Sequence, residues 1–445
     1  MYRSDRLALG LVFCLGCRSG NGNTGQVPDA PPAPDAGIDA ATRGTVTITV
    51  LDLITSTGAP AVGTDVVFLD PDGTLVKRAT TDSDGKAQAD VLPGGSVTGI
   101  GLAHRRTNFT TVLGIKPGDD LVLGTKPADD SVAGTFSVTY PAFSGAASYD
   151  VVSPCDTTSV LAPATGAAPD PAQITIRNSC KLDPMELIVV AWGPAPTGPV
   201  ASISKAGIAF IPGGSTTIDG DYQAFLPFTA SYTDVDPIIS NLEIARTVPA
   251  PPGWVDAVAW SSHGTTATLT ATMPRSSGGQ ITTNVARATG STQAVVETLP
   301  GTVATYGFDV GATLLPWLGQ PTLDGTSRKL VIPTDTTGTT TAKPDLFRIL
   351  ALYSRDDVNH ISTVFNWVVF GPDASDIVIP TFPADLASLP PTAADGVVFP
   401  SAVMIESDSA TYDQMRNDLG TAYDAFINER PSAAKVRISR APPWP

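Results

Sequence analysis

The residues best suited to catalysis in this sequence are few and scattered. Its three histidines, His104, His263 and His360, are about a hundred residues or more apart, and because a Ser-His-Asp triad can assemble from distant positions, this spacing alone decides nothing. The sequence contains no zinc-protease motif, nucleophile elbow, phosphate-binding loop or dinucleotide fingerprint. It therefore gives no positive indication of an enzyme, and we expect exposed or structural histidines.

Paired carboxylates form a second group that could bind a ligand. They are Asp70 with Asp72, Asp82 with Asp84, Asp119 with Asp120, Asp129 with Asp130, Asp219 with Asp221, and Asp356 with Asp357. Their oxygens suit calcium held between β-domains, but no pair belongs to an Asp-x-Asp-x-Asp-Gly series with a distal Glu. Most pairs adjoin Gly or Pro, so we expect turn-stabilising carboxylates, no metal site and no cofactor, with calcium as the alternative.

Large aromatic side chains are the third group. Trp192, Trp254, Trp260, Trp317 and Trp367 lie in or beside predicted strands, with Tyr140, Tyr149, Tyr222 and Tyr306 nearby. Sugar-binding β-modules stack rings on exposed aromatics, whereas a sandwich core needs one or two large rings per module. We expect core positions, and an exposed Trp254 or Trp367 would instead favour glycan binding.

Four cysteines complete the candidates. Cys14 and Cys17 belong to the N-terminal segment, which leaves Cys155 and Cys180 as a pair. In an exported chain an even remainder predicts a disulfide, with two buried free thiols as the alternative. A metal site is disfavoured because no histidine lies near either cysteine.

The N-terminal segment predicts export. The apolar run from Leu7 to Leu15 is too short to span a membrane and suits a signal peptide over residues 1–16. Cys14-Leu15-Gly16-Cys17 resembles the lipobox of bacterial lipoproteins, which implies that Cys17 is acylated and becomes the mature N-terminus. The resemblance also implies an outer-membrane lipoprotein, at the cell surface or on the periplasmic face, because Arg18 replaces the Asp that favours inner-membrane retention. The alternative is an ordinary secretory signal, cleaved near Gly16, without lipid.

Residues 17–44 combine this cysteine with a stretch rich in Pro, Asp and Ala. The stretch has no hydrophobic periodicity and predicts a solvated tether that reaches up to roughly 80 Å. Similar tethers follow the lipobox in surface lipoproteins of Gram-negative bacteria. We therefore expect the folded part to stand away from the membrane.

After Gly44 the hydrophobic pattern has the period of a strand. Residues 45–50 alternate Thr with Val or Ile, and apolar runs then alternate with the turns Asp70-Pro71-Asp72-Gly73 and Asp82-Ser83-Asp84-Gly85. This pattern is typical of an antiparallel sandwich. The stretch 58–68, the second of these turns and Leu92-Pro93-Gly94-Gly95 resemble the carboxypeptidase regulatory-like or bacterial Ig-like β-sandwich. The resemblance implies an accessory module, over residues 45–127, without a catalytic site of its own.

The rest of the chain continues as strands and turns. We predict an all-β protein of three or four β-sandwich domains, Ig-like or prealbumin-like, in tandem. After the first module come a disulfide-containing domain at 131–222, a domain at 223–325 and a C-terminal domain at 326–445, the last two of which could form one unit. One short helix is expected where Tyr412, Met415, Leu419, Tyr423 and Phe426 follow helical spacing, with Asp408 or Ser409 as its cap.

Composition limits the partners. The 445 residues carry a net charge of -16, and only 16% are charged. A chain without clustered Lys and Arg is a poor partner for nucleic acid or for anionic lipid surfaces. We expect a cell-surface lipoprotein, attached to the membrane through Cys17, that presents β-modules for structural, adhesive, protein-binding or glycan-binding contacts. The alternative is a secreted hydrolase of polysaccharide or protein with an accessory N-terminal module.

Overall fold

A computed structural model describes residues 42–442, with gaps. The segments not described are 55–56, 125–128, 164–166, 196–197, 248–254, 261–265, 274–277, 301–302, 325–328, 357–361, 373–375, 393 and 420–434. The chain divides into two units, Met1–Ala41 and Thr42–Pro445. The predicted signal peptide, Cys17 and most of the tether belong to the first unit and lie outside the described residues. Within these residues no helix has the length and apolar character needed to cross a membrane.

The first module is a sandwich of two sheets. Its strands are β1 (Gly44–Val50), β2 (Asp65–Leu69), β3 (Leu75–Thr80), β4 (Lys86–Val91), β5 (Gly95–Ala103), β6 (Arg106–Ile115) and β7 (Asp120–Leu123). One sheet has the order β4-β1-β7, and β3, β2, β5 and β6 belong to the other. The alternation in β1 puts Val46, Ile48 and Val50 into the core, as strand geometry requires.

The second module forms two sheets of its own. Its strands are β8 (Val132–Thr139), β9 (Ser148–Val152), β10 (Thr157–Leu161), β11 (Ala172–Arg177), β12 (Met185–Trp192), β13 (Pro199–Ile208), β14 (Ser215–Thr217) and β15 (Gln223–Ala224). The sheets have the orders β10-β9-β12-β13-β15 and β11-β8-β14. Both contribute to one apolar core, which contains the disulfide.

The third module repeats this layering. Its elements are β16 (Leu226–Thr233), β17 (Ile239–Thr247), β18 (Val255–Trp260), β19 (Thr266–Met273), β20 (Gly278–Arg287), β21 (Thr292–Pro300), β22 (Thr305–Asp309) and the short helix α1 (Val310–Thr313). The sheet β19-β16-β22 shares a core with β17, β20 and β21. Helix α1, capped by Asp309, was not predicted.

The C-terminal segment supplies the remaining elements. They are β23 (Trp317–Leu318), β24 (Thr322–Asp324), β25 (Lys329–Val331), β26 (Thr334–Asp335), β27 (Leu346–Asp356), β28 (Ser362–Gly371), β29 (Asp376–Val378), β30 (Val398–Ser407), helix α2 (Tyr412–Met415), a 3-10 turn (Arg416–Asp418) and β31 (Lys435–Arg440). The small sheet β24-β25-β29 contributes Leu330 and Ile377 to a core beneath β27, β28 and β30. The all-β prediction is confirmed.

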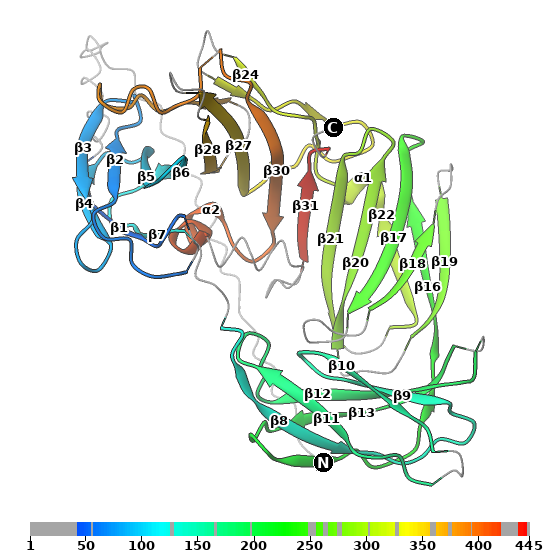
Figure 1. Ribbon diagram of the computed structural model, residues 1–445. Coiled ribbons are helices and arrows are strands. Elements are labelled where there is room, and N and C mark those ends of the chain that lie inside the picture. The colour runs from blue at the N-terminus through cyan, green and yellow to red at the C-terminus, as the bar shows by residue number, and fades with distance from the viewer. Residues whose placement is uncertain are drawn as a thin grey trace, which may run out of the picture. The chain divides into compact units, whose positions relative to one another are not determined.

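Three of the four predicted modules share one sheet, which the sequence did not predict. Twelve strands follow the order β18-β17-β20-β21-β31-β30-β27-β28-β6-β5-β2-β3 (Figure 1). Strand β31 joins the third module to the C-terminal segment by pairing with both β21 and β30. Strand β28 joins that segment to the first module by parallel pairing with β6. The order in the sheet is therefore third module, C-terminal segment, first module.

Helix α2 begins where the spacing predicted, with a different cap. Thr411 is its N-cap, and Gln414 completes a capping box, so the prediction of Asp408 or Ser409 is wrong. The pattern Thr-x-x-Gln satisfies two backbone N–H groups reciprocally, which neither predicted residue does. Tyr412, Met415 and Leu419 pack in the core of the first module together with residues of β30 and β31. Tyr423 and Phe426 lie outside the described residues.

Candidate binding surface

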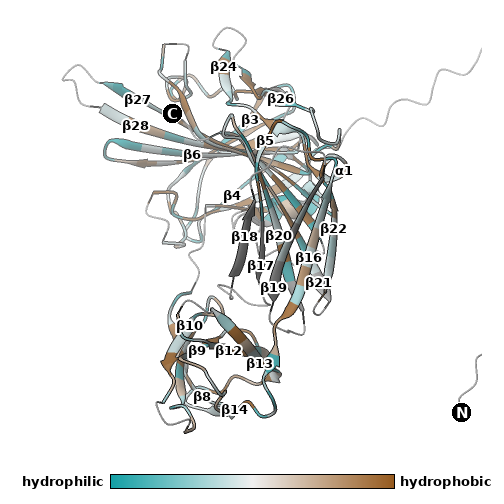
Figure 2. Cartoon of the chain, turned by 90° about the vertical axis from the view of Figure 1, so that its right-hand side faces the viewer, coloured by the Kyte–Doolittle hydropathy of each residue, from teal (hydrophilic) through white to brown (hydrophobic). Residues whose placement is uncertain are grey.

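Hydroxyl side chains predominate on the outer face of the sheet β19-β16-β22. In the central strand, Phe228, Ala230 and Tyr232 point into the core, and the alternate residues Thr229, Ser231 and Thr233 point outward. Strict alternation in a strand that covers a core produces this separation. We call this outward surface the hydroxyl face; its three strands can be followed in Figure 2.

Strand register extends the hydroxyl face on both sides of β16. Thr229 lies opposite Thr270 on β19 and opposite Thr305 on β22, and Ser231 lies opposite Thr268. Thr268, Thr270 and Thr305 are exposed. Neighbouring positions are about 4.8 Å apart across strands and about 6.8 Å apart along a strand. The face thus carries uncharged hydrogen-bonding groups on all three strands, with a gap at Gly307, which lies opposite Ser231 on β22.

The one carboxylate among the described residues of this array is at its end. Asp309, the last residue of β22, accepts a hydrogen bond from the Ala312 N–H at 2.8 Å and thereby caps α1. Its role is therefore structural, and the centre of the hydroxyl face is neutral. Such a face suits an uncharged ligand rich in hydroxyl or amide groups, because hydrogen bonds rather than ion pairs would hold it.

A second face with several hydroxyl side chains lies on the sheet β11-β8-β14, with the exposed Arg177 at the end of β11. Here the hydroxyls bond to one another or to neighbouring side chains: Thr139 Oγ1 donates to Thr217 Oγ1 at 2.8 Å, and Gln173 Nε2 donates to Ser137 Oγ at 2.9 Å. These groups are partly satisfied within the protein. The hydroxyl face of the third module is therefore the better candidate.

The corresponding sheet of the first module is different. On the outer face of β4-β1-β7, Lys86, Asp90 and Asp120 are exposed, and Thr45 donates to Asp90 at 2.7 Å. Charged groups of both signs are what an ordinary soluble surface carries. A neutral outer face is thus a property of particular modules rather than of every sheet in the chain.

The tryptophans that the structure describes fully are core residues. Trp317 and Trp367 are only 1% and 2% exposed, so the core interpretation of both is confirmed. The side chain of Trp367 reaches across the junction between modules, where its Nε1 donates to Thr111 Oγ1 at 2.9 Å. Trp192 is half-buried against the residues of a small apolar cluster. Trp254 and the side chain of Trp260 lie outside the described residues.

The tyrosines are also packed inside. Tyr140, Tyr149 and Tyr306 are buried, and Tyr222 packs against the core of the second module. Burial raises the pKa of Tyr306 far above its ordinary value, and its hydrogen bond to Glu297 acts in the same direction. None of these four rings forms an exposed stacking platform for sugars.

The carboxylate pairs of the first module stabilise turns. Asp82 Oδ1 accepts from the backbone N–H groups of Asp84 and Lys86, both at 2.9 Å, and Asp72 Oδ1 accepts from Thr74 N–H at 2.9 Å. This hydrogen bond lowers the pKa of Asp72. Among the described residues no group of three or more His, Cys, Asp or Glu side chains is placed to hold a metal ion.

The other carboxylate pairs have mixed roles. Asp129 accepts from Ser131, Asp130 accepts from Ser179, and Asp356 accepts from Ser362. Asp119 forms a buried ion pair that the sequence analysis missed, and Asp357 lies outside the described residues. The Asp129 contact is of the kind that a turn-stabilising carboxylate makes, whereas the Asp130 contact joins residues 49 positions apart.

The residues that the structure describes contain no cluster of histidines. His104 is exposed in the turn between β5 and β6, and His263 and His360 lie outside the described residues. No described residue therefore provides a histidine near a nucleophile, and no observation favours the hydrolase alternative.

One pocket lies where the first module meets the C-terminal segment. It has a volume of about 410 Å³, and its lining includes Lys116, Asp345, Tyr412 and Asp413. Lys116 and Asp413 form an ion pair with each other, and this hydrogen bond lowers the pKa of Asp413. Asp345 accepts from Ser407 N–H at 3.0 Å. Since these charged groups already have partners within the protein, the pocket is a weaker candidate than the hydroxyl face.

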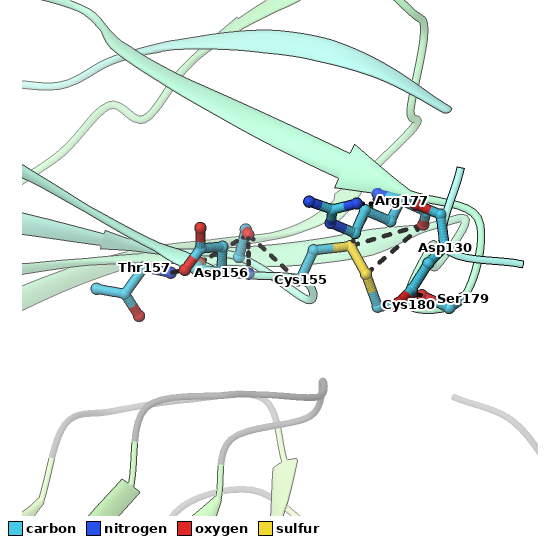
Figure 3. Close-up of a disulfide and its surroundings, with 8 residues drawn as sticks. Asp130, Cys155, Asp156, Thr157, Arg177, Ser179 and Cys180 are labelled. Atoms are coloured by element: carbon cyan, nitrogen blue, oxygen red, sulfur yellow. Dashed lines mark hydrogen bonds between the residues drawn. A yellow bond between two sulfur atoms is a disulfide. The ribbon is translucent and has the colours of Figure 1, made fainter. Parts of the chain in front are cut away.

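The predicted cysteine pair is bonded. Cys155 and Cys180 form a disulfide with an S–S distance of 2.01 Å (Figure 3). Arg177 N–H points at the Cys155 sulfur from 3.3 Å, and Ser179 donates to Asp130 at 2.5 Å. The bond connects the loop before β10 to the loop after β11, so it ties the two sheets of the second module together.

The hydroxyl face was not predicted, because β16 was not identified as a strand from its residues. The available signal was the alternation of Phe228, Ala230 and Tyr232 with hydroxyl residues. Proline at position 227 and the short apolar side chain of Ala230 weakened that pattern.

Comparison with known proteins leaves this chain without a family. No family model matches it, and no curated protein matches it in sequence. Among solved structures it is similar to the Bacillus anthracis TIE protein, with 13% identity over 60% of this chain and a TM-score of 0.16. The chain spans about half the length of that structure, 51%.

Two other solved structures are similar over more of their own length. One is a Ca²⁺-stabilized adhesin with which an Antarctic bacterium reaches out and binds ice, with 13% identity, coverage of 83% of this chain and 96% of that one, and a TM-score of 0.12. The other is BcpA, the major pilin subunit of Bacillus cereus, with 10% identity, coverage of 60% and 98%, and a TM-score of 0.12. These TM-scores are too low to bear on the function of this chain, which has to be argued from its own residues.

Proposed function

We propose that the protein is an exported, lipid-anchored surface protein whose β-modules make adhesive contacts, and that its hydroxyl face binds a neutral polysaccharide. The observation that carries the proposal is the uncharged array centred on Thr229 and Ser231. Hydroxyl donors and acceptors on a rigid sheet complement the hydroxyls of a sugar chain and offer nothing to a polyanion or polycation.

Three further features support a role outside the cell. The lipobox-like segment ending at Cys17 and the tether after it suit a protein held at a distance from its membrane. The disulfide suits an oxidising compartment. The low content of charged residues agrees with outer faces made of Thr and Ser.

The rigidity of β-branched side chains adds to this argument. Thr has few χ1 rotamers in a strand, so its hydroxyl loses little freedom when a ligand binds. Because ordering a side chain opposes association, a preorganised array binds more tightly than an equally polar but flexible one.

A glycan array probed with the folded part of the chain tests the proposal. We expect binding to neutral glycans with little dependence on salt, since no counterions are released. The variant Ser231→Lys places a long charged side chain at the centre of the hydroxyl face and should weaken this binding at least tenfold. Thr175→Lys, at an exposed position on β11 in the second module, is the matched control and should bind as the wild type does.

Three results would contradict the proposal. Binding only to acidic glycans, with strong salt dependence, would place the contact on a charged surface elsewhere. Equal binding by the wild type and Ser231→Lys would remove the hydroxyl face from the interaction. Binding to a protein ligand but to no glycan would leave an adhesive role and refute the polysaccharide.

A further inference from the structure

We infer that each of the first three modules contains a mechanical clamp, formed by parallel pairing of its first strand with a strand near its C-terminal end. The inference rests on the proposed function, because only a surface protein that is anchored at one end and bound at another carries tension. The clamps themselves are a property of the fold and can be measured without a ligand.

In the first module the clamp joins β1 to β7. Residues 47–50 pair in parallel with residues 120–123, and the flanking loops add hydrogen bonds: Thr47 N–H donates to Asp119 O at 2.9 Å, and Leu51 N–H donates to Leu123 O at 2.8 Å. Because the strands are parallel, the polypeptide chain enters the module at one end of the strand pair and leaves it at the opposite end. Tension along the chain therefore pulls the two strands past each other.

The second and third modules repeat the arrangement. Strand β8 pairs in parallel with β14 over residues 137–139 and 215–217. Strand β16 pairs in parallel with β22 over residues 229–233 and 305–309. Strands β8 and β14 form three residue pairs and strands β16 and β22 form five, compared with four in the first module. The parallel pairing therefore recurs in all three modules, with different lengths.

Parallel terminal strands resist force because of the direction of their hydrogen bonds. Inter-strand bonds run across the strands, so a pull along the strands loads the bonds of the register together. A pull that opens a hairpin from its end loads them one after another. A single hydrogen bond contributes only about 1 kcal/mol net, and the shared load is what makes the parallel pair strong.

The disulfide belongs to the module with the shortest clamp. With only three residue pairs, β8 and β14 form the weakest of the three pairings. The bond between Cys155 and Cys180 closes a segment with a sequence separation of 25. If this clamp slips, the enclosed segment cannot extend, so the bond limits how far the module lengthens under tension.

Single-molecule pulling on the mature chain, in two geometries, tests the inference. One handle is attached at Arg18 in both. In the shear geometry the second handle is attached at K126C, which follows β7. In the opening geometry it is attached at P93C, which follows β4 at the end where Gly44 pairs with Val91, so the pull separates β1 from β4 pair by pair.

We expect the first module to rupture at a severalfold higher force in the shear geometry. The variant Thr47→Pro removes the N–H that donates to Asp119 O and should lower the shear force far more than the opening force. Thr47→Val keeps that N–H and should leave the shear force unchanged; it removes only the hydrogen bond that Gln88 on β4 donates to Thr47 Oγ1 at 3.1 Å. Equal wild-type forces in the two geometries would overturn the clamp, even if Thr47→Pro fails to fold. A strong shear response in a chain that binds no glycan would instead refute only the binding of a polysaccharide.

Discussion

The buried ion pair between Asp119 and Arg416 gives the sharpest prediction about stability. The Arg416 guanidinium donates from Nε and Nη2 to the two carboxylate oxygens of Asp119, both at 2.7 Å. The two side chains are 7% and 5% exposed. Asp119 also accepts from Lys116 N–H at 2.7 Å, and Arg416 contacts Asp413 at the rim. The pair connects the turn before β7 to the turn after α2.

Removing one partner of the ion pair should lower the free energy of unfolding by far more than the intact pair contributes to it. Burial alone would lower the pKa of Arg416, but the hydrogen bonds and charges of Asp119 and Asp413 outweigh it and raise this pKa. Asp119→Ala therefore leaves the buried guanidinium with only its contact to Asp413 at the rim, and removing one partner of a buried ion pair typically costs about 3–5 kcal/mol. Asp413→Ala, at the half-exposed partner of the same arginine, should cost at most about 1 kcal/mol.

Hydrogen exchange measured by mass spectrometry separates these cases without assuming that the whole chain unfolds at once. In Asp119→Ala, peptides covering β7 and α2 should exchange about 1,000-fold faster, which is the rate equivalent of about 4 kcal/mol. The double variant Asp119→Leu/Arg416→Met, which leaves no buried charge, should recover most of the loss. Two results would show that the ion pair does not hold the junction. One is that Asp119→Ala raises the exchange rate no more than Asp413→Ala does. The other is that the loss of stability in the double variant equals the sum of the losses in its two single variants.

Three further outcomes are expected. Cys17→Ala should move the mature protein from the membrane fraction to the soluble fraction, and continued sedimentation with membranes would refute the lipid anchor. Replacing both Cys155 and Cys180 with Ala should lower the free energy of unfolding of the second module by about 3 kcal/mol, measured by urea denaturation, because the loop that they close then regains entropy in the unfolded state. An unchanged midpoint would contradict this. Gly85→Ala should destabilise the first module by more than about 1 kcal/mol, since φ is +73° and a Cβ would lie 2.7 Å from Val50 O. Gly63→Ala, with φ of +74° and no atom within 4 Å, is the control with backbone strain alone, and equal melting temperatures for the two variants would rule out the steric contribution.

The sequence predicted strands well where one face is buried and the other is exposed. The stretch 45–50 alternates strictly, and β1 is found at Gly44–Val50. Strand β6 was not predicted although its burial alternates from Arg106 to Thr111, because two of its buried positions are the polar residues Thr107 and Thr111. Strand β5 was not predicted because its burial does not alternate: five consecutive positions from Val97 to Gly101 are buried. A strand covered on both faces has no alternating pattern to recognise.

The junctions between modules could not be predicted, for a different reason. Asn108 and Asn366, whose side chains bond at 2.8 Å, are 258 positions apart, and Asp119 and Arg416 are 297 apart. Each of these residues looks like a surface residue in its own segment. Only the pairing of β6 with β28 brings them together, and no local pattern specifies which distant edge a strand will meet. The disulfide could be predicted because only two cysteines remained to pair.

The shared sheet also protects strand edges that could otherwise pair with another chain. If the modules were independent, β6, β21, β28 and β31 would each be an edge strand with unpaired backbone groups, and such edges promote aggregation. Edge-to-edge pairing provides hydrogen-bond partners for the edge backbone groups of all four strands. It leaves β3 and β18 as the end strands of the sheet. Strand β3 carries Lys77 and Arg78, which donate to Gln88 O and to Asp65, and charged side chains on an edge oppose further pairing. Charged side chains thus protect the β3 edge from other strands, and the hydroxyl face remains uncharged for a ligand.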